Sequence, residues 1–366
     1  MRFAAGAGEA LPVLLGTLLL GAALSFALTP LVRRLAHRLA IFDLPDLRRV
    51  NTSPVARGGG IAVAFASIAA TIGFLIVNGG ERGLHPPSTI GTPELAALLL
   101  GGALAALVGA LDDYWQLRAR WQLVGQLAVA GVAVLLGATP DVINNPLGGT
   151  ISLEGPIGVV FAVVWILGMI NSINFIDGLD GLSSGIGLIA ALTLGLISLT
   201  VAVGPEGQPF VAGLCFALAG ALAGFLRWNF HPATIFAGTS GVMFIGYTLA
   251  LVSILGSAKV AVALLVLGVP IIDTFWIIVR RIAARRSPFT PDRGHIHHRL
   301  LDLGLSHTQT VLLIYGVCGL LGFLALLLPA AGQVVSFLLV LALSGFALFV
   351  VTRRATDRSR DAAKGR

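Results

Sequence analysis

The chain has 366 residues, of which 56% are hydrophobic and only 11% are charged. Soluble domains carry about 25% charged residues, so this composition excludes an ordinary soluble fold and indicates a protein solvated largely by lipid. The net charge of +7 is typical of a nucleic-acid-binding protein, but the positions of the charges give it another origin.

Long apolar stretches occupy most of the chain, and a membrane-spanning helix needs about 20 such residues. The sequence predicts an all-α polytopic membrane protein in which residues 1–352 form a single transmembrane domain and residues 353–366 form a basic tail. About eleven transmembrane helices are expected, over residues 10–30, 59–78, 94–111, 122–139, 156–173, 184–203, 209–226, 241–256, 259–279, 309–328 and 332–352.

The basic residues follow an alternating pattern through the predicted loops. Of the 24 lysines and arginines, only Arg2, Arg82 and Lys259 lie in or beside the set of loops that includes the N-terminus. The positive-inside rule therefore predicts an outer N-terminus and a cytoplasmic C-terminus, and it explains the net charge without a nucleic-acid partner. The outer segment 140–155, with two glycines between short alternating stretches, predicts a small β-hairpin.

Two polar clusters come early on the predicted cytoplasmic side. In the loop 43–60, Arg48 and Arg49 suit a phosphate and the glycines at 58–60 allow close approach to a ligand, although ordinary positive-inside arginines would look similar. Asp112 and Asp113 directly follow an apolar span. This pair suits a divalent cation or a general base, and a solvated helix end is the alternative.

A third cluster has the pattern NxxNxxDGxDGL over residues 171–182. Asn171, Asn174 and Asp177 are spaced i, i+3, i+6 and so lie roughly along one helix face, and Asp180 follows in the second Asp-Gly step. Amide and carboxylate oxygens beside a turn favour a hard-cation or nucleotide site. A simple turn would not need so many aligned polar groups.

The remaining clusters lie in the second half of the chain. Residues 229–241 form a glycine-bounded loop before a helix, which is a common anion-binding arrangement, with a plain linking loop as the alternative, and Phe236 there can stack on a base. The run 292–299, DRGHIHHR, suits a pyrophosphate first and a transition metal second. Asp273, inside a predicted span, is either a functional group or a structural partner for a neighbouring helix.

These clusters, in this order, resemble the polyprenyl-phosphate N-acetylhexosamine-1-phosphate transferase family, and the similarity spans about residues 30–300. The run DRGHIHHRL looks like the GlcNAc-1-phosphate branch more than the phospho-MurNAc-pentapeptide translocase branch. The resemblance implies transfer of a sugar-1-phosphate, GlcNAc-1-phosphate, from a UDP-sugar to undecaprenyl phosphate, with release of UMP, to initiate a cell-envelope glycan. It also implies a bacterial inner-membrane enzyme, a homodimer, and Mg²⁺ as cofactor with Mn²⁺ as the alternative.

The resemblance also assigns roles to individual residues. It implies catalytic roles for Asp112, Asp113, Asp177 and His295. It implies metal binding by Asn174 and Thr239, and substrate binding by Arg49, Asn171, Asp180, Phe236, His297, His298 and Arg299. Within the last group, Asp180 is expected near the uracil and Phe236 stacked on it.

The chain departs from the family pattern at several of these positions. Thr239 stands where the family has a metal-binding aspartate, and a neutral hydroxyl is a far poorer magnesium ligand than a carboxylate. Asn51, Gln122 and Thr234 stand where basic residues are common. Two alternatives therefore stay open: an inactivated homologue that binds without turnover, and a transporter of anionic solutes. Polar groups confined to one membrane face argue against the transporter.

Overall fold

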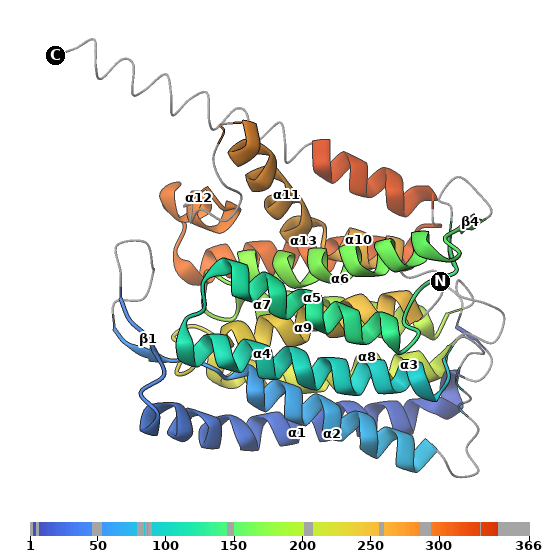
Figure 1. Cartoon of the computed structure of the whole chain (residues 1–366), viewed down its shortest axis with the longest axis horizontal. Coiled ribbons are helices and arrows are strands. Elements are labelled where there is room, and N and C mark those ends of the chain that lie inside the picture. The colour runs from blue at the N-terminus through green and yellow to red at the C-terminus, as the bar shows by residue number, and fades with distance from the viewer. Residues whose placement is uncertain are drawn as a thin grey trace.

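The structure is a computed structural model, and it describes residues 3–4, 7–45, 53–78, 84, 86, 90–144, 150–200, 208–255, 260–283, 285, 294–329 and 331–342. Within this part the chain is mostly helical, and most helices run side by side in one bundle (Figure 1). Two small antiparallel sheets lie at opposite ends of the bundle (Figure 1). One pairs β1 (Phe42–Asp43) with β2 (Val55–Ala56), and the other pairs β3 (Val142–Asn144) with β4 (Thr150–Ser152), which confirms the predicted hairpin.

Many of the helices are suited to cross a membrane. Seven in the described part are long and apolar enough: α1 (Ala7–Arg38), α2 (Gly60–Asn78), the continuous stretch Thr92–Trp115, α6 (Pro156–Ile176), α8 (Pro209–Asn229), α9 (Gly238–Leu255) and α13 (His307–Leu327). The stretch Thr92–Trp115 comprises α3 (Thr92–Ala96), the π-helical turn η1 (Ala97–Gly101) and α4 (Gly102–Trp115).

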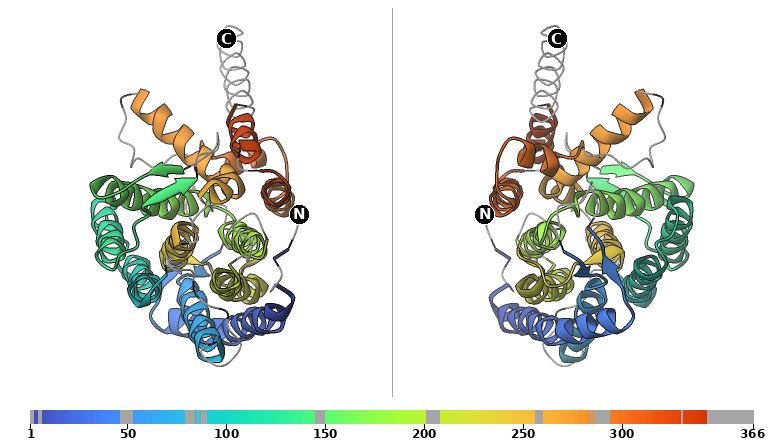
Figure 2. Two further views of the ribbon diagram at one scale, coloured as in Figure 1. Left: turned by 90° about the vertical axis from the view of Figure 1, so that its right-hand side faces the viewer. Right: turned by 90° about the vertical axis from the view of Figure 1, so that its left-hand side faces the viewer.

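The other helices are shorter or bent. The pair α10 (Val260–Val266) and α11 (Gly268–Ala283), bent by 78°, is an eighth candidate span, and α11 leans away from the bundle (Figure 2). The shorter apolar helices are α5 (Ala119–Leu135), α7 (Leu182–Ser198) and Ala331–Ala342, and α12 (Ile296–Asp302) is a short helix before α13. Each predicted span overlaps one of these helices or the bent pair. A multi-pass membrane protein is therefore indicated, while the count of eleven and the orientation stay predictions.

Helix α9 lies at the centre of the bundle, and every one of its residues is buried. It packs against α2, α4, α6, α7 and α8, and the end-on views show it enclosed by other helices (Figure 2). Two glycines permit the closest approaches to its first turn. A Cβ at Gly60 would overlap the backbone of Gly241, and one at Gly109 would overlap Ser240. These contacts fix the first turn of α9 against α2 and α4, where the polar residues gather.

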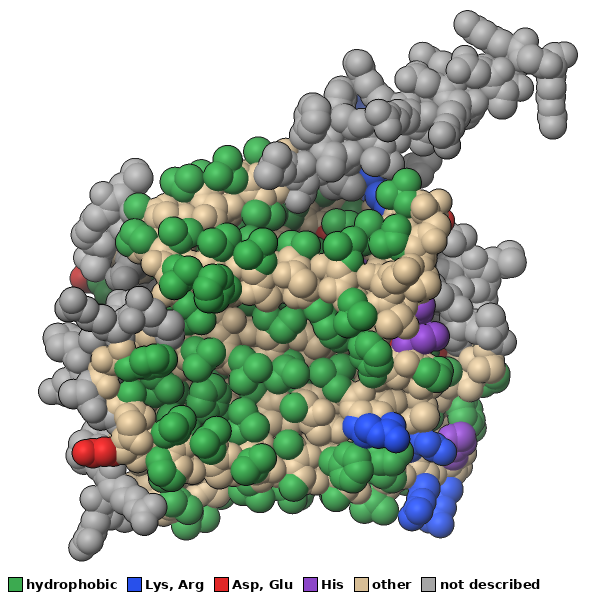
Figure 3. Space-filling view, turned by 180° about the vertical axis from the view of Figure 1, so that it is seen from behind, with side chains coloured by type: hydrophobic (Ala, Val, Ile, Leu, Met, Phe, Trp, Pro, Cys, Tyr) green, Lys and Arg blue, Asp and Glu red, His purple; other side chains and the backbone are tan. Residues whose placement is uncertain are grey.

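The outer surface of the bundle is apolar. Leu19 on α1, Ile76 on α2 and Val164 on α6 are each more than 60% exposed. Figure 3 shows hydrophobic side chains spread across one face, with the basic and histidine side chains of that face toward one end. Such a belt is stable beside lipid chains and costly in water.

Candidate active site

Asp113, near the C-terminal end of α4, is a buried carboxylate that meets four protein donors. Its Oδ1 accepts a hydrogen bond from the backbone N–H of Thr239 at 2.7 Å and lies 2.8 Å from Nε of Arg57. Its Oδ2 accepts from the backbone N–H of Ser240 at 3.0 Å and from the Ser240 hydroxyl at 2.7 Å. Because a carboxylate offers about four lone-pair sites, these donors fill the acceptor capacity of Asp113.

Asp112 is also buried and is held by three further donors. Its Oδ1 accepts from the backbone N–H of Leu117 and from Nε2 of Gln122, both at 2.9 Å. Its Oδ2 accepts from the Thr239 hydroxyl at 2.5 Å. Gln122, at a position where the resemblance implies a basic residue, is thus a neutral donor to Asp112.

The first turn of α9 holds a carboxylate of the protein itself, and binding of a ligand anion by the loop 229–241 stays a prediction. A helix N-terminus favours negative charge because its first N–H groups lack helical partners. Here the N–H groups of Thr239 and Ser240 both point at Asp113. Gly238, with φ +71°, makes the approach possible, because a Cβ there would meet the Asp113 carboxylate.

Arg57, which the sequence reasoning did not single out, completes this centre. It follows β2, donates from Nη2 to the Thr239 hydroxyl at 2.9 Å and pairs with Asp113. Burial opposes its charge, but the carboxylates of Asp113, Asp43 and Asp112 outweigh burial and raise the pKa of Arg57. The sequence signal for Arg57 was its place directly before the glycines 58–60. The phosphate prediction for this loop named the pair Arg48 and Arg49 instead.

The centre formed by Asp112, Asp113 and Thr239 does not fit a magnesium ion as it stands. Mg²⁺ binds oxygen atoms that have a free lone pair, in near-octahedral geometry. Asp113 has its lone pairs occupied, Oδ1 of Asp112 already accepts two hydrogen bonds, and the Thr239 hydroxyl oxygen accepts one from Arg57. The metal role implied for Thr239 would require some of these bonds to be displaced, and it stays a prediction, as does the metal role implied for Asn174 on α6.

Asp177 begins the loop 177–181, which joins α6 to α7 and contacts several other parts of the site. Its Oδ1 accepts from the Ser183 hydroxyl at 2.5 Å, and burial raises its pKa to about 6 against the opposing effects of Ser183 and Arg57. It lies close enough for the charges of Arg57 and Asp113 to influence it. The carbonyl of Gly181 accepts from the Tyr315 hydroxyl at 2.5 Å, which ties the loop to α13.

The histidine motif packs against this loop. His297 is buried, and a Cβ on Gly178 would collide with its ring. Burial, with the nearby His298 and His295, lowers the pKa of His297 well below its usual value, so this ring is neutral at pH 7. His298 lies beside it, with ring centroids 4.4 Å apart.

Asp273 holds the motif in place from α11. Its Oδ2 lies 2.7 Å from Nδ1 of His295, and its Oδ1 accepts from the backbone N–H of Ile296 at 2.9 Å. Of the two interpretations of this intramembrane carboxylate, the structure supports a structural partner that orients His295. Arg299, also predicted to bind substrate, donates from Nε to the Gly294 carbonyl at 2.9 Å.

Asp180 forms a second carboxylate cluster with two histidines that the sequence reasoning did not assign. Its Oδ2 lies 2.7 Å from Nδ1 of His231 and accepts from the backbone N–H of Ala233 at 3.0 Å. Nε2 of His307 lies 4.0 Å from its Oδ1, and the three residues are close enough to hold a metal ion. The site thus contains a possible acidic and histidine metal group. His307 starts α13, and a histidine at a helix end on this side was the available signal.

The remaining predicted residues divide into those near the centre and those away from it. Phe236 is half-buried, and its backbone bonds to Ala56 and Gly59 tie it to the first loop. Asn171 exchanges hydrogen bonds with Gln126 on α5, deeper in the bundle, which gives it a structural partner. Arg49 lies outside the described residues. The elements that carry the other predicted residues, namely the C-terminal ends of α4 and α6, the first turn of α9 and the start of α12, lie at the end of the bundle that carries β1 (Figure 1).

Carboxylates, an arginine and histidines at one end of an apolar bundle are suited to a membrane protein that acts on phosphate-bearing substrates. Comparison with known proteins agrees. The profile described as Glycosyl transferase family 4 matches residues 95–257. A Bacillus subtilis (strain 168) protein described as a probable undecaprenyl-phosphate N-acetylglucosaminyl 1-phosphate transferase is 32% identical over 310 residues, which cover 83% of this chain and 82% of that protein.

Two further relatives show the same pattern. The decaprenyl-phosphate N-acetylglucosaminephosphotransferase of Mycobacterium leprae (strain TN) is 35% identical, over 83% of this chain and 81% of that protein. The undecaprenyl-phosphate alpha-N-acetylglucosaminyl 1-phosphate transferase of Salmonella typhi is 27% identical, over 78% of this chain and 75% of that protein. The chain therefore belongs to glycosyl transferase family 4, and its similarity to these relatives extends across most of its length.

Proposed function

We propose that the protein transfers GlcNAc-1-phosphate from UDP-GlcNAc to undecaprenyl phosphate, at the cytoplasmic face of a bacterial inner membrane, and so starts a cell-envelope glycan. An oxygen of the lipid phosphate forms a new bond to the β-phosphorus of the nucleotide sugar. The bond from that phosphorus to the α–β bridging oxygen breaks, and UMP leaves. The observation that carries the proposal is the joining of the acidic pair, the loop 177–181 and the histidine motif at one end of a membrane bundle.

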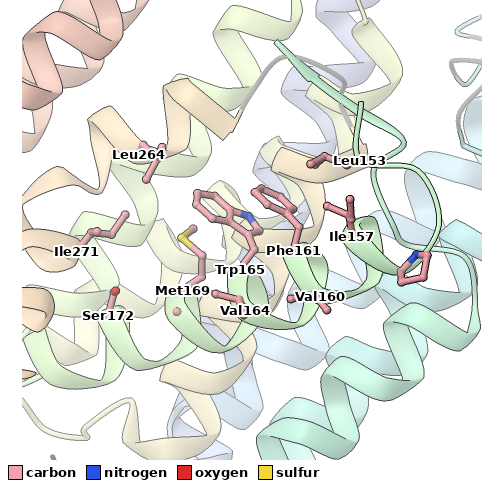
Figure 4. A pocket seen from close by; sticks show the side chains of 12 residues that line it. Leu153, Ile157, Val160, Phe161, Val164, Trp165, Met169, Ser172, Leu264 and Ile271 are labelled. Atoms are coloured by element: carbon pink, nitrogen blue, oxygen red, sulfur yellow. The ribbon is translucent and has the colours of Figure 1, made fainter. Parts of the chain in front are cut away.

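An apolar groove supports a lipid acceptor. It has a volume of about 670 Å³ and runs along α6 beside α10 and α11 (Figure 4). Its ends are marked by Leu153 and Ser172, and Ser172 precedes Asp177 by five residues, or about 8 Å of helix. The lining side chains are apolar except for two polar groups, the Ser172 hydroxyl and the indole N–H of Trp165. The indole N–H donates a hydrogen bond to Ser253. A polyprenyl chain in this groove places its phosphate near the loop 177–181.

Asp177 is the carboxylate best suited to accept the proton of the lipid phosphate. Its pKa of about 6 is close to the second pKa of a phosphate monoester, also about 6, so a proton can pass between them with little energetic cost. Asp112 and Asp113 have most of their oxygen lone pairs engaged, so we assign the pair to positioning Thr239 and Arg57. His297, neutral and buried, can act as a hydrogen-bond partner without adding charge.

The topology and the assembly belong to the same proposal. Eleven spans with an outer N-terminus place the site and the basic loops in the cytoplasm, where a water-soluble nucleotide sugar is made. The β3–β4 hairpin then lies outside, at the opposite end of the bundle from α12 (Figure 1). A homodimer is expected from the family alone. Cysteine-accessibility labelling of single-cysteine variants in sealed vesicles tests the orientation.

A second candidate function is favoured by Thr239. A homologue whose acidic pair is already satisfied by protein donors could bind a nucleotide sugar or lipid phosphate without turnover, as a sensor or scaffold. The transporter alternative has less support, because the helix ends that carry the polar clusters lie at one end of the bundle rather than midway across it (Figure 1).

The deciding experiment measures UMP release by the purified full chain in nanodiscs with UDP-GlcNAc, undecaprenyl phosphate and Mg²⁺. We expect UMP in proportion to a new glycolipid, no UMP when the lipid is omitted, and little UMP from the variant Asp177→Asn. Binding of UDP-GlcNAc by calorimetry without UMP release would replace this function with the binding function. Flux of the intact donor into sealed vesicles would support the transporter.

A further inference from the structure

We infer that Arg57 takes the place of a divalent cation at the Asp112–Asp113 pair of this chain. The guanidinium balances the charge of the pair and turns its remaining donors toward the substrate phosphate. This inference rests on the proposed function only for the identity of that phosphate. The pairing itself is a property of the unliganded chain and is tested without any assay of turnover.

The contacts of Arg57 are those of an internal counter-ion. Its Nε lies 2.8 Å from Oδ1 of Asp113, and its Nη2 lies 3.8 Å from Oδ2 of Asp112 and donates to Thr239 at 2.9 Å. One side chain therefore contacts both carboxylates and the residue that stands at the usual metal-ligand position. A divalent ion bound to this pair would have to occupy the same space and displace the same bonds.

Thr239 fits the replacement of a metal ion by Arg57, because it contacts both the arginine and the acidic pair. Its hydroxyl receives a hydrogen bond from Arg57 and donates one to Asp112, so it relays the arginine charge to the second carboxylate. An aspartate here would add a third negative charge beside two carboxylates and could not donate to Asp112. Three carboxylates with one arginine carry a net charge of about −2 and would attract a divalent cation, whereas the present set carries about −1.

Arg57 also keeps donors for a ligand. A guanidinium has five N–H groups, and the contacts above use Nε and one N–H of Nη2. Among the residues that the structure describes, Nη1 comes no nearer to a carboxylate than 3.9 Å from Asp43, and the side chain is 20% exposed. The planar fork suits a phosphate oxygen pair, and the family reaction brings phosphates to this end of the bundle.

The experiment measures binding of Mn²⁺ alone to the purified full chain, by electron paramagnetic resonance and calorimetry, with no substrate present. Four chains are compared: the wild type, Thr239→Asp, the matched control Thr239→Ser, and Arg57→Gln. We expect the wild type and Thr239→Ser to bind weakly and alike. Thr239→Asp and Arg57→Gln should each bind at least about tenfold more tightly, because one adds a ligand and the other vacates the cation position.

Two outcomes overturn the inference. One is tight Mn²⁺ binding by the wild type that Asp113→Asn weakens about tenfold, which would mean that the pair already holds a metal. The other is unchanged or weaker binding in Arg57→Gln while its melting temperature stays close to that of the wild type, which would make Arg57 a structural arginine only. If the Arg57→Gln variant unfolds, the Arg57→Lys variant is measured in its place. Lysine keeps the charge but cannot make the forked contacts of arginine, so its affinity for Mn²⁺ should lie between those of the wild type and Thr239→Asp. Absence of UMP release affects the proposed function and leaves this comparison intact.

Discussion

Two pairs of aspartates lie at the same end of the bundle, and their surroundings give them different chemistry. Asp112 and Asp113 are buried and meet backbone N–H groups, hydroxyls, an amide and Arg57. Asp177 and Asp180 lie on a half-buried loop, where the contacts described are a hydroxyl, one backbone N–H and histidine rings. The number of donors that already occupy a carboxylate therefore limits its capacity to bind a cation.

The largest expected effect is on the loop. Asp177→Asn removes the carboxylate that we propose accepts the proton of the lipid phosphate. Because general-base catalysis contributes about 10²–10⁴-fold, we expect kcat to fall by about that factor. Rates of UMP release measure it. Ser183→Ala is the matched control, because it removes the hydrogen bond at 2.5 Å but keeps the carboxylate, and it should lower kcat far less. Equal losses in both variants would assign a structural role to Asp177.

The next effect concerns the packing of α2 against the first turn of α9, which holds the donors to Asp113 in place. Gly60→Ala places a methyl group on the backbone of Gly241 and pushes α2 away from the first turn of α9. Overpacking costs about 1–3 kcal/mol, and more where backbone is the obstacle, so the melting temperature should drop sharply. Gly131→Ala on α5 meets open space, and it should be neutral or slightly stabilising. Similar melting temperatures for the two variants would contradict the close packing of α2 on α9.

A smaller effect is expected from pH. The pKa of Asp177 is raised to about 6, so this side chain holds a proton more tightly in the folded protein than in the unfolded protein. The stability this supplies is present below the ordinary carboxyl pKa and is lost as pH rises through about 6. Without added metal, the melting temperature of the wild type relative to Asp177→Asn should therefore be roughly 2–5 °C higher at about pH 4.5 than at about pH 7.5. A difference that does not change with pH would contradict the raised pKa.

The smallest expected effect is on the groove. Val164→Phe fills part of the apolar groove without touching the polar residues, so we expect KM for undecaprenyl phosphate to rise severalfold with kcat nearly unchanged. Leu107→Phe, at a similarly exposed position on α4, is the control. A short-chain polyprenyl phosphate should be less sensitive than the long one. An equal response to both lipids would place the tail elsewhere.

Much of the fold could be predicted from the sequence, because apolar stretches of membrane length are a strong local signal. Each predicted span meets a helix, and the 140–155 hairpin is present as β3 and β4. The 78° bend between α10 and α11 was not predicted, because hydropathy marks a span but not its direction, which depends on packing. The central place of α9 was also hidden, since hydropathy does not distinguish helices that face lipid from helices that face protein.

The sequence predicted many of the residues at the site but few of the contacts between them. The NxxNxxDGxDGL run and the histidine motif, each singled out for its polar residues, meet where Gly178 packs on His297. Arg57 and His307 were missed, because a lone arginine in a basic loop and a lone histidine at a helix start are common without a role. Their partners come from residues far away in the sequence, Asp113 and Asp180, and only the fold brings these together.

The most direct test of the proposed reaction follows the fate of the β-phosphate. The purified chain is given UDP-GlcNAc labelled with ³²P in the β-phosphate, undecaprenyl phosphate and Mg²⁺, and the organic and aqueous phases are separated. Sugar-1-phosphate transfer predicts that the label enters the lipid phase while unlabelled UMP appears in the water phase, and that both depend on Asp177. Label that stays in the water phase as UDP or as the intact donor would contradict the proposed reaction.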